Sequence, residues 1–272
     1  IDSVSALSLV DAPILSLSEI TPPEKNTSIK IDQPYFYSTK ADLSLSQIIA
    51  NKDMLPWQKY DDASLVPTKR DTALWFIFQV KPTSGSSKLA SQHADKTLDS
   101  ENWVFMLTWA LLEHAQVHTI NNVTGEQWSS HPVGINYPVS ERYFDSRQFA
   151  FPLPAIKNDP VTVLVEIQSS NLLTFPGSMM SEGTFKKLDV LDTLISGCVI
   201  GSLIVMLLYN LSLFLALKER SYLYYSLYIF SVTFYFLAAS GLGFNYVWDE
   251  FSWLKYKAFS VFSSLSFIMM IL

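Results

Sequence analysis

The sequence predicts a β-sandwich or β-barrel followed by membrane-spanning α-helices. Two observations indicate the helices: the apolar segments 193–217 and 222–240 are nearly uncharged, and only the charged turn 218–221 separates them. A bilayer core about 30 Å thick needs roughly 20 helical residues, and a helix satisfies its own backbone polar groups in lipid. The third observation is that short β-prone runs and turn residues dominate the part before residue 188, as in sandwiches and barrels.

The apolar segments are long enough to cross a bilayer, and two of them in succession disfavour the alternative of a buried hairpin in a soluble protein. We expect spans at about 191–217, 222–240 and 256–272. The third run stops at Leu272 without a polar flank, so we expect further spans and a further domain beyond it. Basic residues lie on both sides of these segments, which leaves the orientation open on charge alone.

Composition excludes several classes of function. The formal net charge is −6 and no basic patch is present, which argues against nucleic-acid binding. The single cysteine, Cys198, rules out an intramolecular disulfide and a thiolate-rich metal site. The nucleophile elbow G-x-S-x-G, the Walker loop and H-E-x-x-H are all absent, so nothing predicts an enzyme or a cofactor within these residues. Since the chain begins with Ile1, we expect that a preceding segment, such as an export signal, has been removed.

The chain divides into three predicted parts: an extended leader (1–27), a β-sandwich domain (28–187) and a membrane domain (188–272). Within the second part, alternation near Ile29 and Ile31 and the aromatic run 35–37 indicate a strand. The capping-box pattern S-x-x-Q at Ser44 predicts a short helix over 45–51.

Five further runs predict strands. Residues 72–80 are almost all apolar, as in a central strand buried on both faces, and 81–102 is a long polar stretch expected to form a surface loop. Strand patterns resume at 103–112 and at 116–120, and the proline in 149–153 is typical of an edge strand. In 161–168 the residues at odd positions are all valine or isoleucine, which predicts one buried face.

The region around the charged turn carries a family resemblance. Tyr209-Asn210-Leu211, the turn and Ser221-Tyr222-Leu223-Tyr224-Tyr225 resemble the junction of the first two spans in bacterial seven-transmembrane receptors with diverse intracellular signalling modules. The segment 241–248 is similar to the loop after the second span of that family. Upstream, 71–78 and 149–185 resemble strands of the second type of extracellular sensor domain in the same family.

This resemblance implies a jelly-roll-like sensor domain in the bacterial periplasm, seven helices in the inner membrane and a cytoplasmic output module after residue 272. A diguanylate cyclase is the first expectation for that module, and a histidine kinase is the second. The family's sensor domain resembles carbohydrate-binding modules, so a small ligand, with carbohydrate as the candidate class, is the expected partner. The alternatives are a membrane-tethered carbohydrate-binding or envelope-assembly module without signalling, and a membrane-anchored hydrolase with two carboxylates within about 10 Å.

Carbohydrate binding requires aromatic platforms for sugar C–H faces and a few charged groups that fix orientation. On that basis the candidate ligand-binding residues are Trp57, Trp109, Trp128, Tyr137, Arg142, Tyr143 and Arg147. The alternative for each aromatic side chain is packing in the core or anchoring of a loop. The arginines can equally be solvated or pair with Glu141 and Asp145.

Two other patterns concern metal binding and helix packing. His114 and His118 share one face of a strand or a helix, but a metal site needs a third ligand and the sequence nominates none. Gly197 and Gly201 form G-x-x-x-G in the first span, which predicts close packing within the bundle or, alternatively, against a second receptor in a homodimer. Asn210 is an amide within the span that prefers a hydrogen-bond partner on a neighbouring helix.

Overall fold

The computed structural model describes residues 14–16, 28–31, 34–40, 43–51, 54–60, 72–81, 103–109, 111–153, 159–170, 175, 177–248 and 252–271. The chain forms two compact units, residues 1–137 with 141–186 and residues 187–272 with 138–140. We describe each unit by itself.

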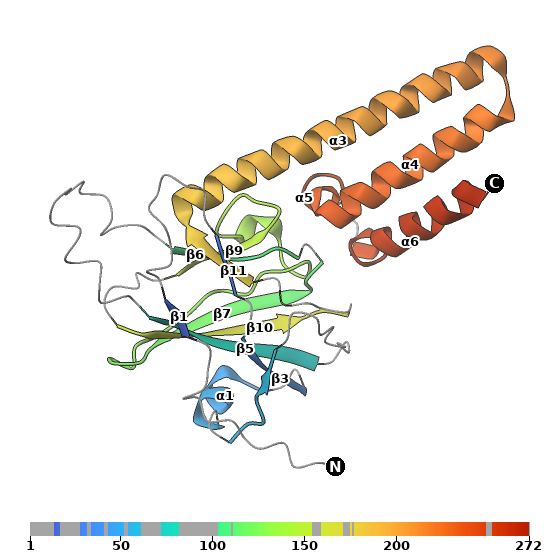
Figure 1. The fold of residues 1–272 in the computed structure, drawn as a ribbon. Helices are drawn as coiled ribbons and strands as arrows, with labels where there is room; N and C mark the ends of the chain where they lie inside the picture. The colour runs from blue at the N-terminus through green and yellow to red at the C-terminus, as the bar shows by residue number, and fades with distance from the viewer. Residues whose placement is uncertain are drawn as a thin grey trace, which may run out of the picture. The chain divides into compact units, whose positions relative to one another are not determined.

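The first unit is a β-sandwich of two sheets (Figure 1). The larger sheet has the order β4 (Gln58–Lys59), β3 (Tyr35–Lys40), β5 (Thr72–Lys81), β10 (Val161–Gln168), β7 (His114–Asn121) and β8 (Gln127–Ser129). The strand β1 (Ile14–Ser16) pairs with β5 in parallel. The smaller sheet has the order β2 (Ile29–Lys30), β11 (Gly177–Ser181), β6 (Trp103–Leu107) and β9 (Phe149–Leu153), and a 3-10 helix, η4 (Val139–Glu141), lies between β8 and β9 in the chain. The predicted all-β sandwich is confirmed.

The main core lies between the sheets and follows from strand periodicity. Val161, Val163, Val165 and Ile167 all belong to this core, which confirms the predicted buried face of β10. Successive side chains of a strand point to opposite faces, so a strand that is apolar throughout must be covered on both sides. In β5 the side chains of 74, 76 and 78 enter the main core, whereas those of 73, 75 and 77 join a second cluster on the outer face of the large sheet.

The second cluster is covered by α1 (Leu45–Asn51), which has the predicted bounds. The backbone N–H of Ser44 donates to the side-chain oxygen of Gln47 at 3.0 Å, as the capping-box pattern requires. Ile48 is 1% exposed and packs in this cluster with Trp57 and Trp75. The short helix therefore covers the outer face of the large sheet over β3 and β5. Other side chains occupy that face over β10 and β7.

One predicted strand is shorter in the structure, and a second lies at the sheet edge as predicted. The run predicted over 103–112 ends as a strand at Leu107, because this residue pairs with Phe149 and Gly177, the first residues of both neighbouring strands. The strand 149–153 lies at the edge of its sheet, where the missing N–H of proline is tolerated. The predicted loop over 81–102 and leader over 1–27 lie outside the described residues, apart from Lys81 in β5 and the three residues of β1.

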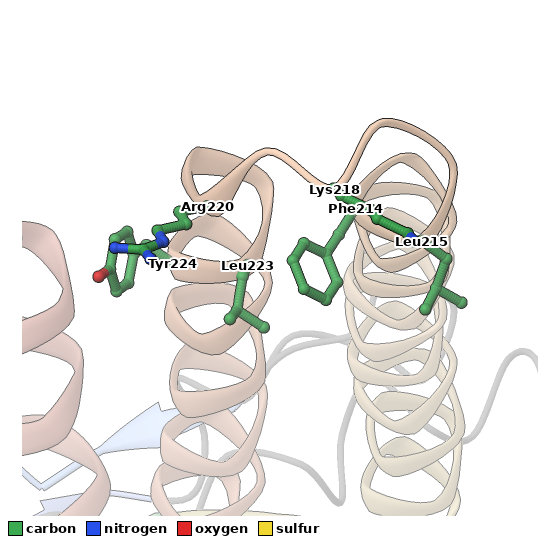
Figure 2. Close-up of a pocket in the computed structure, with 6 residues that line it drawn as sticks. All are labelled: Phe214, Leu215, Lys218, Arg220, Leu223 and Tyr224. Carbon is green, nitrogen blue, oxygen red and sulfur yellow. The ribbon is translucent and has the colours of Figure 1, made fainter.

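The second unit consists of helices. They are α3 (Glu182–Leu217), whose first residues belong to the first unit, α4 (Arg220–Ser240), α5 (Leu242–Tyr246) and α6 (Ser252–Ile271). Among the described residues, α3 and α4 are long and apolar enough to cross a membrane, and α6 contains a shorter apolar stretch, Lys257–Ile271, within the expected third span. Ala238, Trp248 and Ala258 form the core that joins α4 to α6. Lys218, at φ 55, ends α3 and leads into the turn before α4 (Figure 2).

Candidate ligand-binding site

A strip of polar side chains lies on the outer face of the large sheet, where strands β7 and β10 run side by side. His114, Gln116 and His118 alternate along β7 and point away from the sandwich core, since Ala115 and Val117 between them belong to that core. Strand register places Gln116 opposite Glu166 and His114 opposite Gln168 on β10. We call His114, Gln116, His118, Glu166 and Gln168, together with Tyr137, the outer-face strip.

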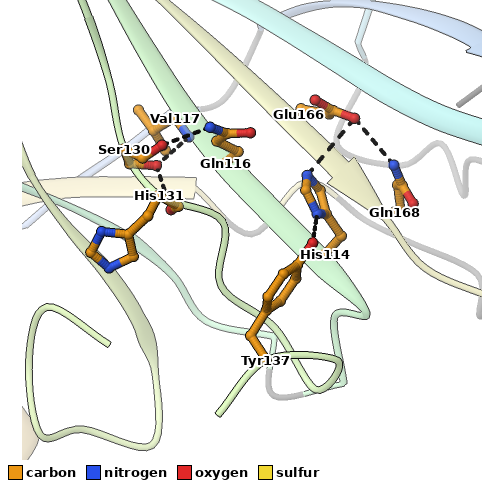
Figure 3. A network of polar contacts seen from close by, with 8 residues as sticks. All are labelled: His114, Gln116, Val117, Ser130, His131, Tyr137, Glu166 and Gln168. Atoms are coloured by element: carbon orange, nitrogen blue, oxygen red, sulfur yellow. Dashed lines mark hydrogen bonds and ion pairs between the residues drawn. The ribbon is translucent and has the colours of Figure 1, made fainter. Parts of the chain in front are cut away.

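Hydrogen bonds order one end of the strip (Figure 3). The Nδ1 atom of His114 lies 2.6 Å from the hydroxyl of Tyr137, and its Nε2 lies 3.8 Å from the Glu166 carboxylate. The Gln168 amide donates to the same carboxylate at 3.1 Å. The side chains of His114 and Glu166 are only 13% and 14% exposed. A phenol, an imidazole, a carboxylate and an amide are thus held in sequence at the surface, with their orientations mutually fixed.

Electrostatics keep the phenol of Tyr137 protonated. Its pKa is raised because burial disfavours the phenolate, and the carboxylates of Glu166 and Glu141 act in the same direction. A protonated phenol both donates and accepts hydrogen bonds, so it bonds to the Nδ1 atom of His114 in either imidazole tautomer, and the Nε2 atom of His114 faces Glu166. The carboxylate of Glu166 and the amides of Gln168 and Gln116 then supply both acceptors and donors for a polar ligand.

The other end of the strip is a stacked pair of rings. His118 lies parallel to Trp75, with 5.7 Å between the ring centroids, and its Nδ1 is 2.8 Å from the hydroxyl of Ser129 on β8. Burial lowers the pKa of His118 to about 4; Glu166 acts in the opposite direction and His114 in the same one. The Nε2 of His118 and the indole N–H of Trp75 are buried and form no hydrogen bond with the part of the chain that the structure describes. His118 is therefore a neutral, buried imidazole at neutral pH.

Hydrogen bonds from β7 to Ser130 hold the segment that leads to Tyr137 against this strand. Gln116 donates to the carbonyl of Ser130 at 2.6 Å, and the Ser130 hydroxyl accepts from the backbone of Val117. At Gly134 the φ of 152° suits only glycine, and a Cβ there would meet the Glu113 carbonyl oxygen at 2.4 Å. This close approach brings the chain back over β7, so Tyr137 reaches His114, which lies 23 positions earlier in the sequence.

Of the seven residues predicted to bind a ligand, the structure places only Tyr137 in the outer-face strip. Trp57 is 2% exposed and belongs to the cluster under α1, and Trp109 packs against the main core. Trp128 is half-buried opposite Thr119 of β7, hence on the core-side face of the sheet and not with His118. These three indoles do not form one platform.

The other three predicted residues lie outside the strip, and two of them contact neighbouring aromatic rings. Tyr143 stacks on His131 with 4.0 Å between centroids, and its hydroxyl accepts from the His131 backbone N–H at 3.0 Å. The guanidinium of Arg142 lies 4.8 Å from the centre of the Phe149 ring and donates to the carbonyl of Ser146. Arg147 is half-buried nearby in the sequence. Ligand binding by these residues remains a prediction.

Sequence reasoning missed Glu166 and Gln168. The available signal was a carboxylate and an amide two positions apart on one face of a valine-rich strand, but only the pairing of β10 with β7 shows that they meet His114. Glu166 also lies near the two histidines for which the sequence nominated no third metal ligand. Within the described ranges, however, no group of three His, Cys, Asp or Glu side chains has an arrangement that could hold a metal ion.

The predicted packing residues of the first span lie on α3. A Cβ added at Gly197 or at Gly201 would meet no described atom within 4 Å, so the G-x-x-x-G face is open. Asn210 is buried, and its amide donates to the carbonyl of Met206 at 2.8 Å. Asn210 therefore forms one hydrogen bond within its own helix, and a partner on a neighbouring helix stays a prediction.

Comparison with known families gives two matches. Residues 33–181, more than half of the chain, match the family model described as 7TMR-DISM extracellular 2. Residues 192–272 match the model described as 7TM diverse intracellular signalling. No curated protein matches the chain significantly.

Proposed function

Since this chain belongs to the family of seven-transmembrane receptors with diverse intracellular signalling modules, we propose that its extracellular sandwich binds a small ligand and transmits that event through the membrane helices. The family and the two membrane-capable helices identify a membrane sensor with an N-terminal extracellular domain. The proposal places it in the inner membrane of a bacterium, with the sandwich in the periplasm and an output module, such as a diguanylate cyclase or a histidine kinase, in the cytoplasm.

One observation carries this proposal: the sensor and the first span are continuous. Strand β11 ends at Ser181 and α3 begins at Glu182, with no loop between them. The helix then runs for 36 residues, so a displacement of β11 is passed directly to the α3 backbone. A ligand shifts such a system only if it binds one arrangement of β11 and α3 more tightly than the other.

The outer-face strip is the ligand site that the proposal favours, and a carbohydrate is the ligand class. A sugar hydroxyl donates one hydrogen bond and accepts others, which matches a carboxylate with amides beside it. Glu166 supplies the carboxylate, Gln116 and Gln168 supply the amides, and Tyr137 supplies an aromatic ring at the border of the strip. Glu166 and Gln168 of the strip lie on β10, which pairs with β5 and β7 over most of its length and is thereby fixed within the sheet.

Calorimetry of residues 28–187 against a panel of glycans tests the ligand class. We expect a binder whose affinity falls about tenfold or more in Glu166→Gln, because a hydrogen bond to a charged group is worth about 1.5–3 kcal/mol. Glu126→Gln is the matched control, since Glu126 is exposed in the turn before β8 and carries the same charge. A panel without any binder would count against carbohydrate, and an equal loss in both variants would remove the strip from the site.

The transmission step needs the full receptor and its own output assay. Insertion of two glycines between Ser181 and Glu182 should leave ligand affinity unchanged and abolish the response, because a flexible joint absorbs the displacement of β11. The same insertion after Val123, in the exposed turn between β7 and β8, is the control and should preserve the response. A response that survives the first insertion would show that the signal does not pass through the joint between β11 and α3, and the absence of any ligand response in the intact receptor would support a tethered binding or assembly module.

A further inference from the structure

Glu166 uses one of its two carboxylate oxygens for contacts with the residues that the structure describes. The amide of Gln168 donates to Oε1 at 3.1 Å, and the Nε2 atom of His114 lies 3.8 Å from the same oxygen. Oε2 has no hydrogen-bond partner in the described ranges, and it is not buried, unlike the Nε2 atoms of His114 and His118. The second oxygen of Glu166 is therefore an acceptor that a ligand can reach.

A second free acceptor lies directly across the strand pair, on Gln116. The register of β7 and β10 places Gln116 opposite Glu166. Its amide nitrogen donates to the carbonyl of Ser130 at 2.6 Å, which fixes the orientation of the amide group. The amide oxygen then has no partner in the described part of the chain, and it is not buried. In Figure 3 this oxygen and the free oxygen of Glu166 lie on the sides of the two groups that face each other.

The charge of Glu166 is not balanced by a lysine or an arginine. Its carboxylate forms no ion pair with either residue type within the described ranges, although the side chain is only 14% exposed. The Nε2 atom of His114, at 3.8 Å, is too distant to donate a hydrogen bond to it. His118 is neutral at neutral pH, because burial lowers its pKa to about 4. A carboxylate withdrawn from water is unfavourable unless a cation or several donors compensate it.

We propose that the ligand presents a protonated amine to the outer-face strip, so that the carbohydrate is an amino sugar. This inference rests on the proposed function, because it specifies the ligand of the same site. An ammonium group has three N–H donors and no acceptor, whereas a hydroxyl has one donor. One N–H bonds to the free oxygen of Glu166 and another to the oxygen of Gln116, and the positive charge balances the carboxylate. A hydroxyl satisfies only one of the two acceptors and leaves the charge unbalanced.

Calorimetry of the intact receptor in nanodiscs tests this inference with three tetrasaccharides. Cellotetraose, its N-acetylglucosamine counterpart and its glucosamine counterpart share one linkage and differ only in a hydroxyl, an acetamide or an amine on each sugar ring. The titrations are made at about pH 6, below the pKa of an ordinary amine, so the glucosamine tetramer is charged. The measured quantity is the ratio of its affinity to the affinity of each neutral tetramer.

The wild-type receptor should bind the glucosamine tetramer about tenfold more tightly than either neutral tetramer, since hydrogen bonds between charged groups are stronger than those of neutral ones. Glu166→Gln removes the charge and nearly keeps the shape, so this preference should fall to about twofold or less. Glu126→Gln is the matched control, because it makes the same charge change in an exposed turn and should keep the preference. A variant that folds poorly lowers all three affinities together and leaves their ratio in place.

The results that would overturn the inference differ in what they say about the proposed function. A neutral tetramer that binds as tightly as the glucosamine tetramer would exclude an amine from the site and leave the carbohydrate proposal intact. A preference that persists in Glu166→Gln, or that is lost equally in Glu126→Gln, would assign it to the net charge of −6 and not to Glu166. If none of the three tetramers binds, the carbohydrate class itself is refuted, and the amino sugar with it.

Discussion

Acidification is expected to destabilise the sensor domain through His118. This imidazole is 4% exposed, stacks on Trp75 and bonds to Ser129 on the neighbouring strand. Burial lowers its pKa from 6.5 to about 4, so in the folded domain it resists protonation over this interval while the unfolded chain takes up the proton. Stability is thus fully present above about pH 6.5 and is lost as the pH falls toward the folded pKa.

The size of the effect follows from the interval between the two pKa values. One pKa unit corresponds to about 1.4 kcal/mol, so between about pH 7 and about pH 4 the domain should lose about 3 kcal/mol through this residue. The neighbouring charges of Glu166 and His114 act in opposite directions, which leaves burial as the dominant cause. Since a whole domain is typically stable by only about 5–15 kcal/mol, a loss of this size is readily measured.

The assay is urea unfolding of residues 28–187, followed by tryptophan fluorescence at several pH values. Other carboxylates also titrate in this range, so the informative quantity is the difference between the wild-type domain and His118→Phe, which retains a ring against Trp75 without the ionisable nitrogen. We expect the wild-type domain to lose about 3 kcal/mol more than the variant. Parallel pH profiles would refute the reasoning, as would an NMR titration that places the pKa of His118 near its ordinary value.

The remaining predictions concern packing. Phe76→Ala should lower the free energy of unfolding of the sensor domain by about 3–5 kcal/mol in urea titrations, because Phe76 is 0% exposed in the main core; a loss below about 1 kcal/mol would contradict that position. Gly134→Ala should cost more than about 1 kcal/mol by the same method and should weaken ligand binding, since a Cβ would collide with the Glu113 carbonyl and displace Tyr137. Gly197→Leu with Gly201→Leu should lower the dimer fraction in detergent cross-linking, because the open face then cannot admit a second helix closely. An unchanged dimer fraction would assign that face to packing within one receptor.

Local sequence patterns were sufficient to predict the helices and strands whose buried face follows from one regular spacing of apolar residues. The odd-numbered valines of β10 face the main core as predicted. Alternate side chains of a strand lie on one face, and an apolar face is buried in the core. The helix 45–51 begins at its capping box, and its bounds agree with the prediction. The strand predicted over 103–112 was too long, since its end is set by where two neighbouring strands begin, which no local pattern records.

Which aromatic side chains are available to a ligand is a tertiary property. Trp57 and Trp109 are equally plausible platforms in the sequence, yet one is buried under α1 and the other packs on the main core. Residue type states what chemistry a side chain offers, whereas exposure depends on which element covers it. The same reason separates Trp128 from His118, which lie on opposite faces of one sheet.

By itself the sequence pattern determined that the chain combines an all-β domain, a sandwich or a barrel, with membrane helices, because hydrophobic length and alternation are read along the chain without reference to any contact. Tertiary structure alone decided that Tyr137, His114 and Glu166 form one strip, and that Gln116 lies opposite Glu166 within it. The strip joins residues from β7, β10 and a distant loop. Such contacts depend on strand register and on the path of the loop, and a linear pattern specifies neither.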